Sequence, residues 1–127
     1  VLQVKLKSFI KYELGQVNQI AEWYKTRLQE IVIIPKIKEG FYSSWAQYTV
    51  VCKSLDEREY IQKILKTNNI PYAVYYAKGM HEQVAFRKKC IEVGDYENTV
   101  YLKEKVISLP IHPYMKKDDV LFVTQLF

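Results

Sequence analysis

Glycine, cysteine and histidine are all scarce in this chain of 127 residues. The four glycines are widely separated, so they cannot form a glycine-rich loop that cradles phosphate groups. The two cysteines, Cys52 and Cys90, have neither metal-ligand spacing nor the number that a disulfide framework needs. The two histidines, His81 and His112, have no nucleophile–base motif near them. The sequence therefore shows no self-contained catalytic or metal site.

Long apolar runs are also absent. No apolar stretch approaches the roughly 18 residues that a membrane-spanning helix needs, so we expect no membrane association. Lysines interrupt the apolar pattern of residues 1–12, so we do not expect these residues to be a signal peptide. Cysteine usage of this kind indicates a reducing compartment, and we expect a cytoplasmic protein with Cys52 buried in a strand.

The charge balance is only mildly basic. Charged residues make up 26% of the chain and the net charge is +5, but the lysines and arginines are scattered in small groups. Such an excess favours phosphates or acidic partners in general. Because the aromatic residues are not interleaved with a basic stripe, nucleic-acid binding is the least favoured function.

The first third of the chain has a helical pattern. From Leu2 to Ile31 apolar residues recur at steps of three and four, which predicts one long helix with a possible bend at Gly15. Pro35 ends this pattern. The helix begins without a capping residue, as if it had been cut from a longer protein.

The remaining pattern predicts a mixed body of strands and helices. Three short strands are expected, over residues 47–53, 72–76 and 106–109. A capping box at residues 54–57 starts one helix, Asn68 and Asn69 suit its left-handed end, a short helix follows Glu82, and Asp118 can cap the last helix. The fold class is therefore α+β, a single domain over residues 1–127 with a small antiparallel or mixed sheet and helices on one side of it.

Four segments in order carry a resemblance to a known family. They are LQVKLKSFIKYELGQVNQIAEWYKTRL (2–28), SSWAQYTV (43–50), NNIPYAVYYAKGMHEQVAF (68–86) and GDYENTVYLKEKVISLPIHPYM (94–115). Together they resemble the C-terminal small domain of the DegT/DnrJ/EryC1/StrS aminotransferases, which use pyridoxal phosphate (PLP) to aminate keto sugars carried on nucleotides. The resemblance makes residues 1–33 an inter-domain helix and residues 46–127 the α+β body.

The resemblance also implies candidate substrate residues. Ser44, Trp45 and Gln47 would face the substrate cleft from one loop, and Tyr76, Lys78 and His81 from the turn between a strand and a helix. Aromatic faces stack on sugars or bases, lysine and histidine carry charge to phosphate, and glutamine bonds hydroxyl groups in both directions. The structural alternatives are a core position for Tyr76, a solvated turn for Lys78, a helix start for His81 and an ordinary loop for Ser44. For His112, between two prolines, the expectation is a structural turn.

The same resemblance implies that the cofactor lysine and the phosphate-binding residues lie in a larger preceding domain. This chain has no Schiff-base motif, so we expect no PLP bound to it alone and no aminotransferase activity without the large domain. Where the family has proline after the tyrosine pair, this chain has Ala77, which loosens the pocket-forming turn. The chain would then be a fragment, a split-gene product or a remnant.

Two other readings remain open. The chain could be a free-standing module that binds a nucleotide sugar or an acidic protein. It could also associate with itself or with a large domain through an exposed helix face, for which Leu2, Leu6, Phe9 and Ile10 are the candidates.

Overall fold

The computed structural model describes residues 2–86, 89, 91 and 93–127. Its elements, in chain order, are α1 (Leu2–Ser8), the π-helical turn η1 (Phe9–Glu13), α2 (Leu14–Leu28), β1 (Tyr48–Val51), α3 (Leu55–Thr67), the 3₁₀ turn η2 (Met80–Glu82), α4 (Glu97–Lys105), β2 (Val106–Leu109) and α5 (Lys117–Thr124). The predicted α+β class is confirmed.

The predicted N-terminal helix is present as the continuous run α1–η1–α2. Its irregularity is the π-helical turn at Phe9–Glu13, and not a bend at Gly15. In a π-helix residues five apart come into register, and the Ser8 hydroxyl donates to the Glu13 carboxylate at 3.2 Å. Buried residues on this run begin at Glu13, whereas α1 buries none of its own.

The sheet of the described residues has two strands, not the three predicted. β1 and β2 pair antiparallel, with Tyr48 opposite Leu109 and Val51 opposite Val106. The expected strand at 72–76 shrinks to one bridge, between Ala73 and Ser108. Pro71 lacks a backbone N–H and the chain turns away at Tyr75, so the ladder cannot extend on either side.

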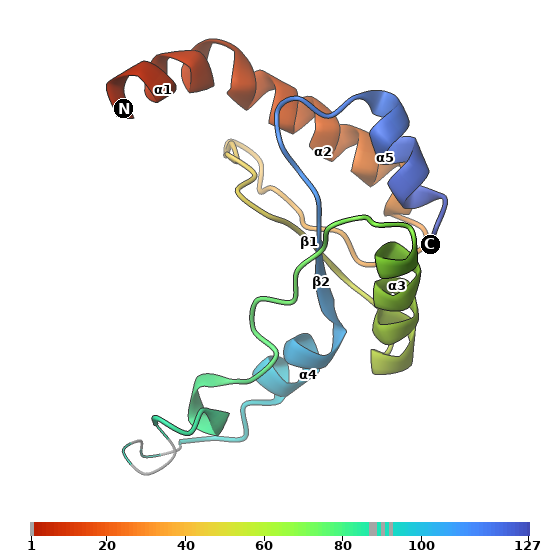
Figure 1. Ribbon diagram of the computed structural model, residues 1–127. Coiled ribbons are helices and arrows are strands. Elements are labelled where there is room, and N and C mark those ends of the chain that lie inside the picture. Colours follow the sequence, from red (N-terminus) through yellow and green to blue (C-terminus); the bar gives the residue numbers. More distant parts are fainter. Residues whose placement is uncertain (1, 87–88, 90, 92) are drawn as a thin grey trace.

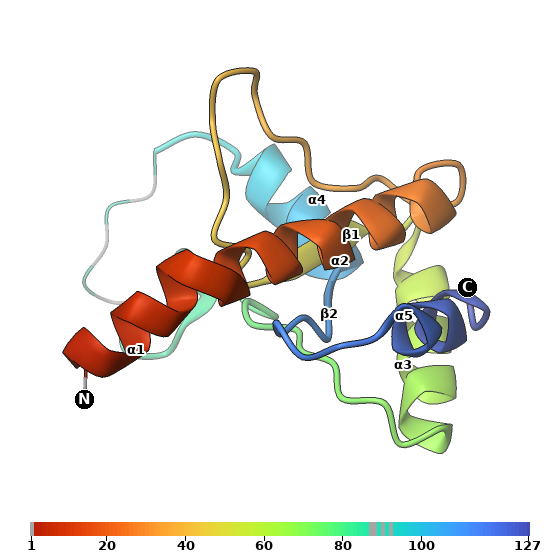
Figure 2. The same cartoon turned by 90° about the horizontal axis from the view of Figure 1, so that it is seen from above.

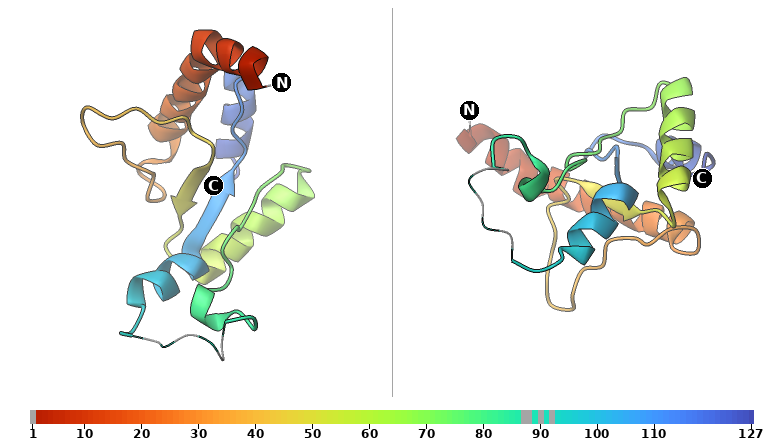
Figure 3. Two further views of the ribbon diagram at one scale, coloured as in Figure 1. Left: turned by 90° about the vertical axis from the view of Figure 1, so that its left-hand side faces the viewer. Right: turned by 90° about the horizontal axis from the view of Figure 1, so that it is seen from below.

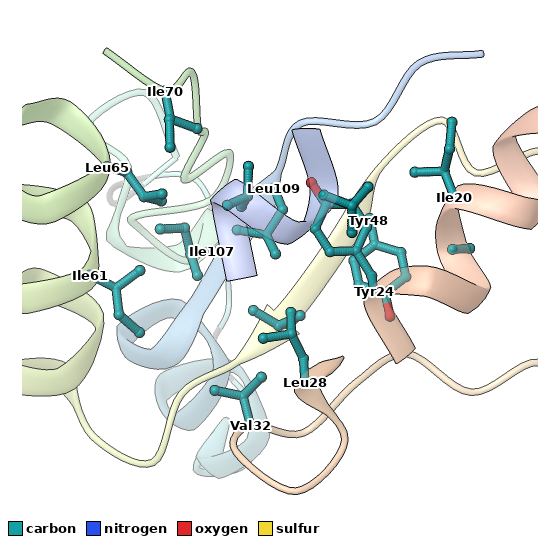
Figure 4. Close-up of a cluster of buried hydrophobic side chains, with 14 of the residues drawn as sticks. Ile20, Tyr24, Leu28, Val32, Tyr48, Ile61, Leu65, Ile70, Ile107 and Leu109 are labelled. Carbon is teal, nitrogen blue, oxygen red and sulfur yellow. The ribbon is translucent and has the colours of Figure 1, made fainter. Parts of the chain in front are cut away.

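One core joins the sheet to three helices. Figure 4 shows residues that form this core: Tyr24 and Leu28 of α2, Ile61 and Leu65 of α3, and Tyr48, Ile107 and Leu109 of the strands. Val120 and Val123 of α5 complete it. The burial of Cys52 is confirmed, but Cys52 directly follows β1 and is not part of the strand. Burial raises the pKa of its thiol to about 11, so this cysteine is a poor nucleophile at neutral pH.

Helix ends follow local sequence signals in part. The Ser54 hydroxyl accepts the Glu57 N–H at 3.1 Å, and Asn69 adopts the left-handed conformation (φ +55°), both as predicted. Asp118 is not the cap of α5; instead the Asp119 carboxylate accepts the Lys116 N–H at 2.7 Å. The short helix expected after Glu82 is the earlier turn η2, and residues 87, 88, 90 and 92 lie outside the described part of the chain.

The elements occupy two ends of an elongated molecule. In Figure 1 the α1–α2 run and α5 lie at one end, α3 lies beside the strands, and α4 with the turn η2 lies at the other end. Seen from above, α2 crosses over β1 while α1 projects away from the body (Figure 2). The two strands run between these ends (Figure 3). No helix in the described part of the chain is long and apolar enough to cross a membrane.

Candidate functional site

The first group of predicted site residues lies on the loop before β1. Asn18 of α2 holds this loop: its side-chain nitrogen donates to the Ser43 carbonyl at 3.0 Å, and its side-chain oxygen accepts the Trp45 indole N–H at 3.0 Å. Trp45 is held in the left-handed region (φ +47°), which is rare for a bulky residue and needs such support. The loop is therefore fixed by α2.

The three residues of this group differ in availability. The Trp45 ring is half-buried and packs on Tyr48, with ring centroids 5.3 Å apart. Its indole N–H is bonded to Asn18 and part of its surface is covered by Tyr48, so neither is available to a ligand. Ser44 and Gln47 are exposed. Trp45 therefore positions the loop, while Ser44 and Gln47 are free to contact a ligand.

The second group follows the bridge at Ala73. Tyr76 is 72% exposed, so the alternative of a core position is wrong. Lys78 is also exposed, and His81 is half-buried in η2. Two of the three side chains are therefore accessible on the same short turn.

His81 is held by its neighbours. Its ring stacks on Tyr96 with a centroid distance of 4.6 Å and an interplanar angle of 13°. A side-chain carbon at position 79 would lie 2.6 Å from the imidazole Cε1, so the ring needs a glycine beside it. The imidazole is thus placed by Gly79 on one side and Tyr96 on the other.

A carboxylate closes this turn. The backbone N–H of Gly79 donates to Glu82 at 2.8 Å, and the Lys103 ammonium of α4 bonds the other oxygen of the same carboxylate. The bond from Lys103, and then that from Gly79, hold the pKa of Glu82 below its usual value. The turn that carries Lys78 and His81 is therefore tied to α4.

The six predicted residues do not share one cavity. Trp45 and Tyr48 line a cavity of about 630 Å³ between α2 and residues 32–37. Gln47 lines a different one, of about 280 Å³, at the end of the sheet. Tyr76, Lys78 and His81 line neither.

Three further residues, which were not among the predicted substrate residues, lie beside Gln47. Tyr72, Tyr75 and His112 line the same cavity of about 280 Å³. The expected turn at His112 is present, since its carbonyl accepts the Met115 N–H at 3.2 Å. Tyr75 stands next to the predicted Tyr76, but the sequence alone could not show which tyrosine of the pair faces Gln47.

The two half-buried lysines of the described chain are not free to hold PLP. PLP is held as a Schiff base by a lysine whose amine must be free to react. Among the lysines that the structure describes, only Lys103 and Lys105 are half-buried, and Lys103 pairs with Glu82 while Lys105 lies over the Tyr101 ring. Neither of these two amines therefore fits the role of the cofactor lysine.

Comparison with known proteins identifies the family. The model of the "DegT/DnrJ/EryC1/StrS aminotransferase family" matches residues 1–127. The chain belongs to this family. Its members are PLP-dependent aminotransferases, which confirms the resemblance drawn from the four segments.

Two curated relatives are named for nucleotide sugars. The chain is 36% identical over 126 residues to the "UDP-2-acetamido-2-deoxy-3-oxo-D-glucuronate aminotransferase" of Pseudomonas aeruginosa, covering 97% of this chain and 33% of that protein. It is 23% identical to an Acidithiobacillus ferrooxidans 3-aminotransferase of UDP-N-acetyl-3-dehydro-α-D-glucosamine, covering 94% and 31%. The chain thus spans about a third of the length of these relatives.

Solved structures agree on the fold. A DegT/DnrJ/EryC1/StrS aminotransferase from Brucella abortus superposes with a TM-score of 0.78 at 28% identity, over 89% of this chain and 30% of that one. S. venezuelae DesV in complex with a ketimine intermediate gives a TM-score of 0.87 at 20% identity, over 99% of this chain and 33% of that one. The isolated chain therefore has the fold of the corresponding part of the larger aminotransferases.

Proposed function

We propose that this chain is the small C-terminal domain of a PLP-dependent aminotransferase acting on nucleotide-linked keto sugars, used in the synthesis of cell-surface polysaccharides. The observation that carries the proposal is a family match over the whole chain combined with coverage of only a third of each relative. The chain alone is inactive, because the residues that hold the cofactor belong to the large domain. In this assignment residues 1–33 connect the two domains and residues 46–127 form the small domain.

The chain contributes substrate contacts to the shared cleft. The exposed Lys78 ammonium offers charge to a diphosphate, and the exposed Tyr76 ring offers a face for a sugar or base. Ser44 and Gln47 supply hydrogen bonds to hydroxyl groups. Trp45 and His81 act mainly through position, because Asn18 and Tyr96 hold them in place. We also propose a cytoplasmic location, which the two cysteines without a disulfide framework support.

Reconstitution with a large domain tests the proposal. The chain is added to the part of the P. aeruginosa relative that it does not cover, together with PLP, an amino donor and UDP-linked keto sugar. We expect amino-sugar formation to rise with the concentration of the chain and to saturate. No product at saturating chain, with association of the two parts shown by sedimentation, contradicts the proposed function.

A matched pair of lysines tests the substrate contact. In the reconstituted enzyme Lys78→Ala should raise the KM for the nucleotide sugar about tenfold, the loss of one charge-assisted bond. Lys63→Ala, which removes an exposed lysine of α3, should leave the KM unchanged. An equal effect of both substitutions would show that Lys78 acts only through net charge.

The alternative is a free-standing nucleotide-sugar or protein-binding module derived from this domain. The cavity beside Gln47 favours it, since residues of this chain form that cavity without another domain. Binding of UDP-, GDP- or dTDP-sugars to the chain alone, with no gain of activity on adding a large domain, would support this alternative.

A further inference from the structure

A further cavity, of about 190 Å³, lies between α2 and α5. The described residues that line it all come from these two helices: Trp23, Thr26, Arg27, Lys117, Val120 and Leu121. The two helices lie side by side at one end of the molecule (Figure 1). Buried residues of both belong to the common core, so the packing of that core fixes the walls of the cavity.

One part of the lining is apolar and aromatic. Val120 is almost fully buried and Leu121 is half-buried. Trp23 is also half-buried, because it packs against the core and lines the cavity as well. An indole placed in this way keeps ring surface on which the ring of a ligand can stack. This part of the lining therefore suits a flat, apolar group.

The remaining lining carries hydrogen-bond donors that are not in use. The Trp23 indole N–H, the Arg27 guanidinium and the Lys117 ammonium make no hydrogen bond or ion pair with the described part of the chain. The Thr26 hydroxyl, by contrast, donates to the Glu22 carbonyl at 2.8 Å. The lining thus offers three free donors, of which two are positively charged.

These two cations have no counter-ion in the cavity. No aspartate or glutamate belongs to the described lining. Asp119, close to Lys117 in sequence, is occupied at the start of α5, where its carboxylate accepts the Lys116 N–H at 2.7 Å. A guanidinium binds a carboxylate through two parallel hydrogen bonds, and a nearby ammonium strengthens the attraction. The charge of the lining therefore favours a ligand with a carboxylate group.

The size of the cavity limits the rest of the ligand. About 190 Å³ lies below the range of pockets for drug-sized ligands, roughly 300–1,000 Å³. One aromatic ring with a short acidic side chain agrees with this volume, with the apolar surface and with the free donors. A nucleotide sugar, which has several rings and a diphosphate, is too large for it.

We propose that the cavity between α2 and α5 binds a small aromatic carboxylate. Its ring packs on Trp23, and its carboxylate pairs with Arg27 and Lys117. None of the six predicted substrate residues lines this cavity, so the inference goes beyond the proposed function and does not depend on it.

NMR titration of the ¹⁵N-labelled chain with phenylacetate tests the inference. The chain has two tryptophans, and their indole N–H groups give two separate signals. We expect millimolar phenylacetate to shift the Trp23 indole signal and the amides of Arg27 and Leu121 in a saturable way. The Trp45 indole N–H, which is bonded to Asn18, should stay unchanged and serves as the internal control.

Two matched compounds separate the ring from the charge. 2-Phenylethanol has the same ring without the carboxylate, and acetate has the carboxylate without the ring. Each should bind at least about tenfold more weakly than phenylacetate, because it lacks one of the two contacts.

Two substitutions test the cations, with a neighbouring lysine as the control. Arg27→Gln and Lys117→Gln should each weaken phenylacetate binding about tenfold, the loss of one charge-assisted contact. Lys116→Gln removes the same charge from an exposed residue next to Lys117 that does not line the cavity, and it should leave binding unchanged. The amide spectrum of each variant shows whether it is folded.

Three results would overturn the inference. The first is no saturable shift of the Trp23 indole signal with phenylacetate. The second is binding of 2-phenylethanol or acetate as tight as that of phenylacetate. The third is an effect of Lys116→Gln equal to that of Arg27→Gln and Lys117→Gln, which would mean that only net charge matters. The reconstitution experiment tests the proposed function separately, and neither result decides the other.

Discussion

Two stacked tyrosines in the core, Tyr24 and Tyr48, differ in a single hydrogen bond. Their ring centroids lie 4.9 Å apart and both are almost fully buried. The Tyr24 hydroxyl donates to the Pro110 carbonyl at 2.8 Å, whereas the buried Tyr48 hydroxyl has no hydrogen-bond partner among the described residues. Burial raises the pKa of both hydroxyl groups, so both are neutral at physiological pH.

Removal of each hydroxyl should have opposite effects on stability. Tyr24→Phe loses a bond and leaves the Pro110 carbonyl without that donor, so the free energy of unfolding should fall by about 1 kcal/mol. Tyr48→Phe removes a buried polar atom that makes no bond, so the free energy should stay the same or rise by up to about 1 kcal/mol. Urea denaturation of the two variants measures both changes, and a loss of stability in Tyr48→Phe contradicts the unpaired state of that hydroxyl.

At the scale of single residues, some contacts could not be predicted from the sequence. The loop with Ser44, Trp45 and Gln47 could be predicted from its segment, but its fixation by Asn18 could not. Asparagine inside a helix is a weak signal, and its partner Trp45 is 27 residues away. Which tyrosine of the pair at 75–76 joins Gln47 likewise depends on the bridge at Ala73, a contact with a segment distant in sequence.

At the scale of elements, the turn η2 depends on the charge of Glu82. The hydrogen bond from Lys103 is the main cause of the lowered pKa of Glu82, and the hydrogen bond from the Gly79 N–H is the second. A lowered folded-state pKa means that this stabilisation is complete above the usual glutamate value, near 4.3, and is lost as the pH falls through the folded-state pKa below it. The turn that carries His81 should therefore loosen in acid before the core unfolds.

Local hydrogen exchange and the ring signals of His81 and Tyr96 measure this loosening. Glu82→Gln should open the turn already at neutral pH and remove the acid transition there. Glu59→Gln, an exposed residue of α3, should leave both unchanged. An acid transition that persists in Glu82→Gln would assign it to other carboxylates.

Elements that depend on local signals were predicted well. The N-terminal helical run, α3 with its Ser54 cap and the left-handed Asn69 are each set by neighbours in sequence. The third strand was not, because a strand exists only where a partner ladder continues, and here Pro71 and the turn at Tyr75 limit it to one bridge. The π-helical turn was also not predicted. Its last residue, Glu13, is buried, and its carboxylate accepts a 2.8 Å hydrogen bond from the hydroxyl of Tyr114, a residue that follows β2 and is distant in sequence.

At the scale of the whole molecule, one end presents an unusual apolar surface. On one side of the N-terminal helical run, Leu2 is 77% exposed, Ile10 is 66% exposed and Leu6 is 49% exposed. Phe9, expected to join them, is half-buried. α1 projects away from the body, so no described element covers this face (Figure 2). Several large apolar side chains exposed on one side of a helix indicate an interaction surface.

We expect the isolated chain to associate with itself through this face. Leu6→Glu combined with Ile10→Glu places two charges on the patch and should shift the chain to a monomer in sedimentation velocity. Leu102→Glu, which alters an exposed leucine of α4 at the other end of the molecule, should not change the association. Because the proposed large domain would cover the same face, its addition should also convert the self-associated chain into a complex of one chain with one large domain. A parent chain that sediments as a monomer at high concentration, or an association that survives the double substitution, would show that α1 is not the interaction surface.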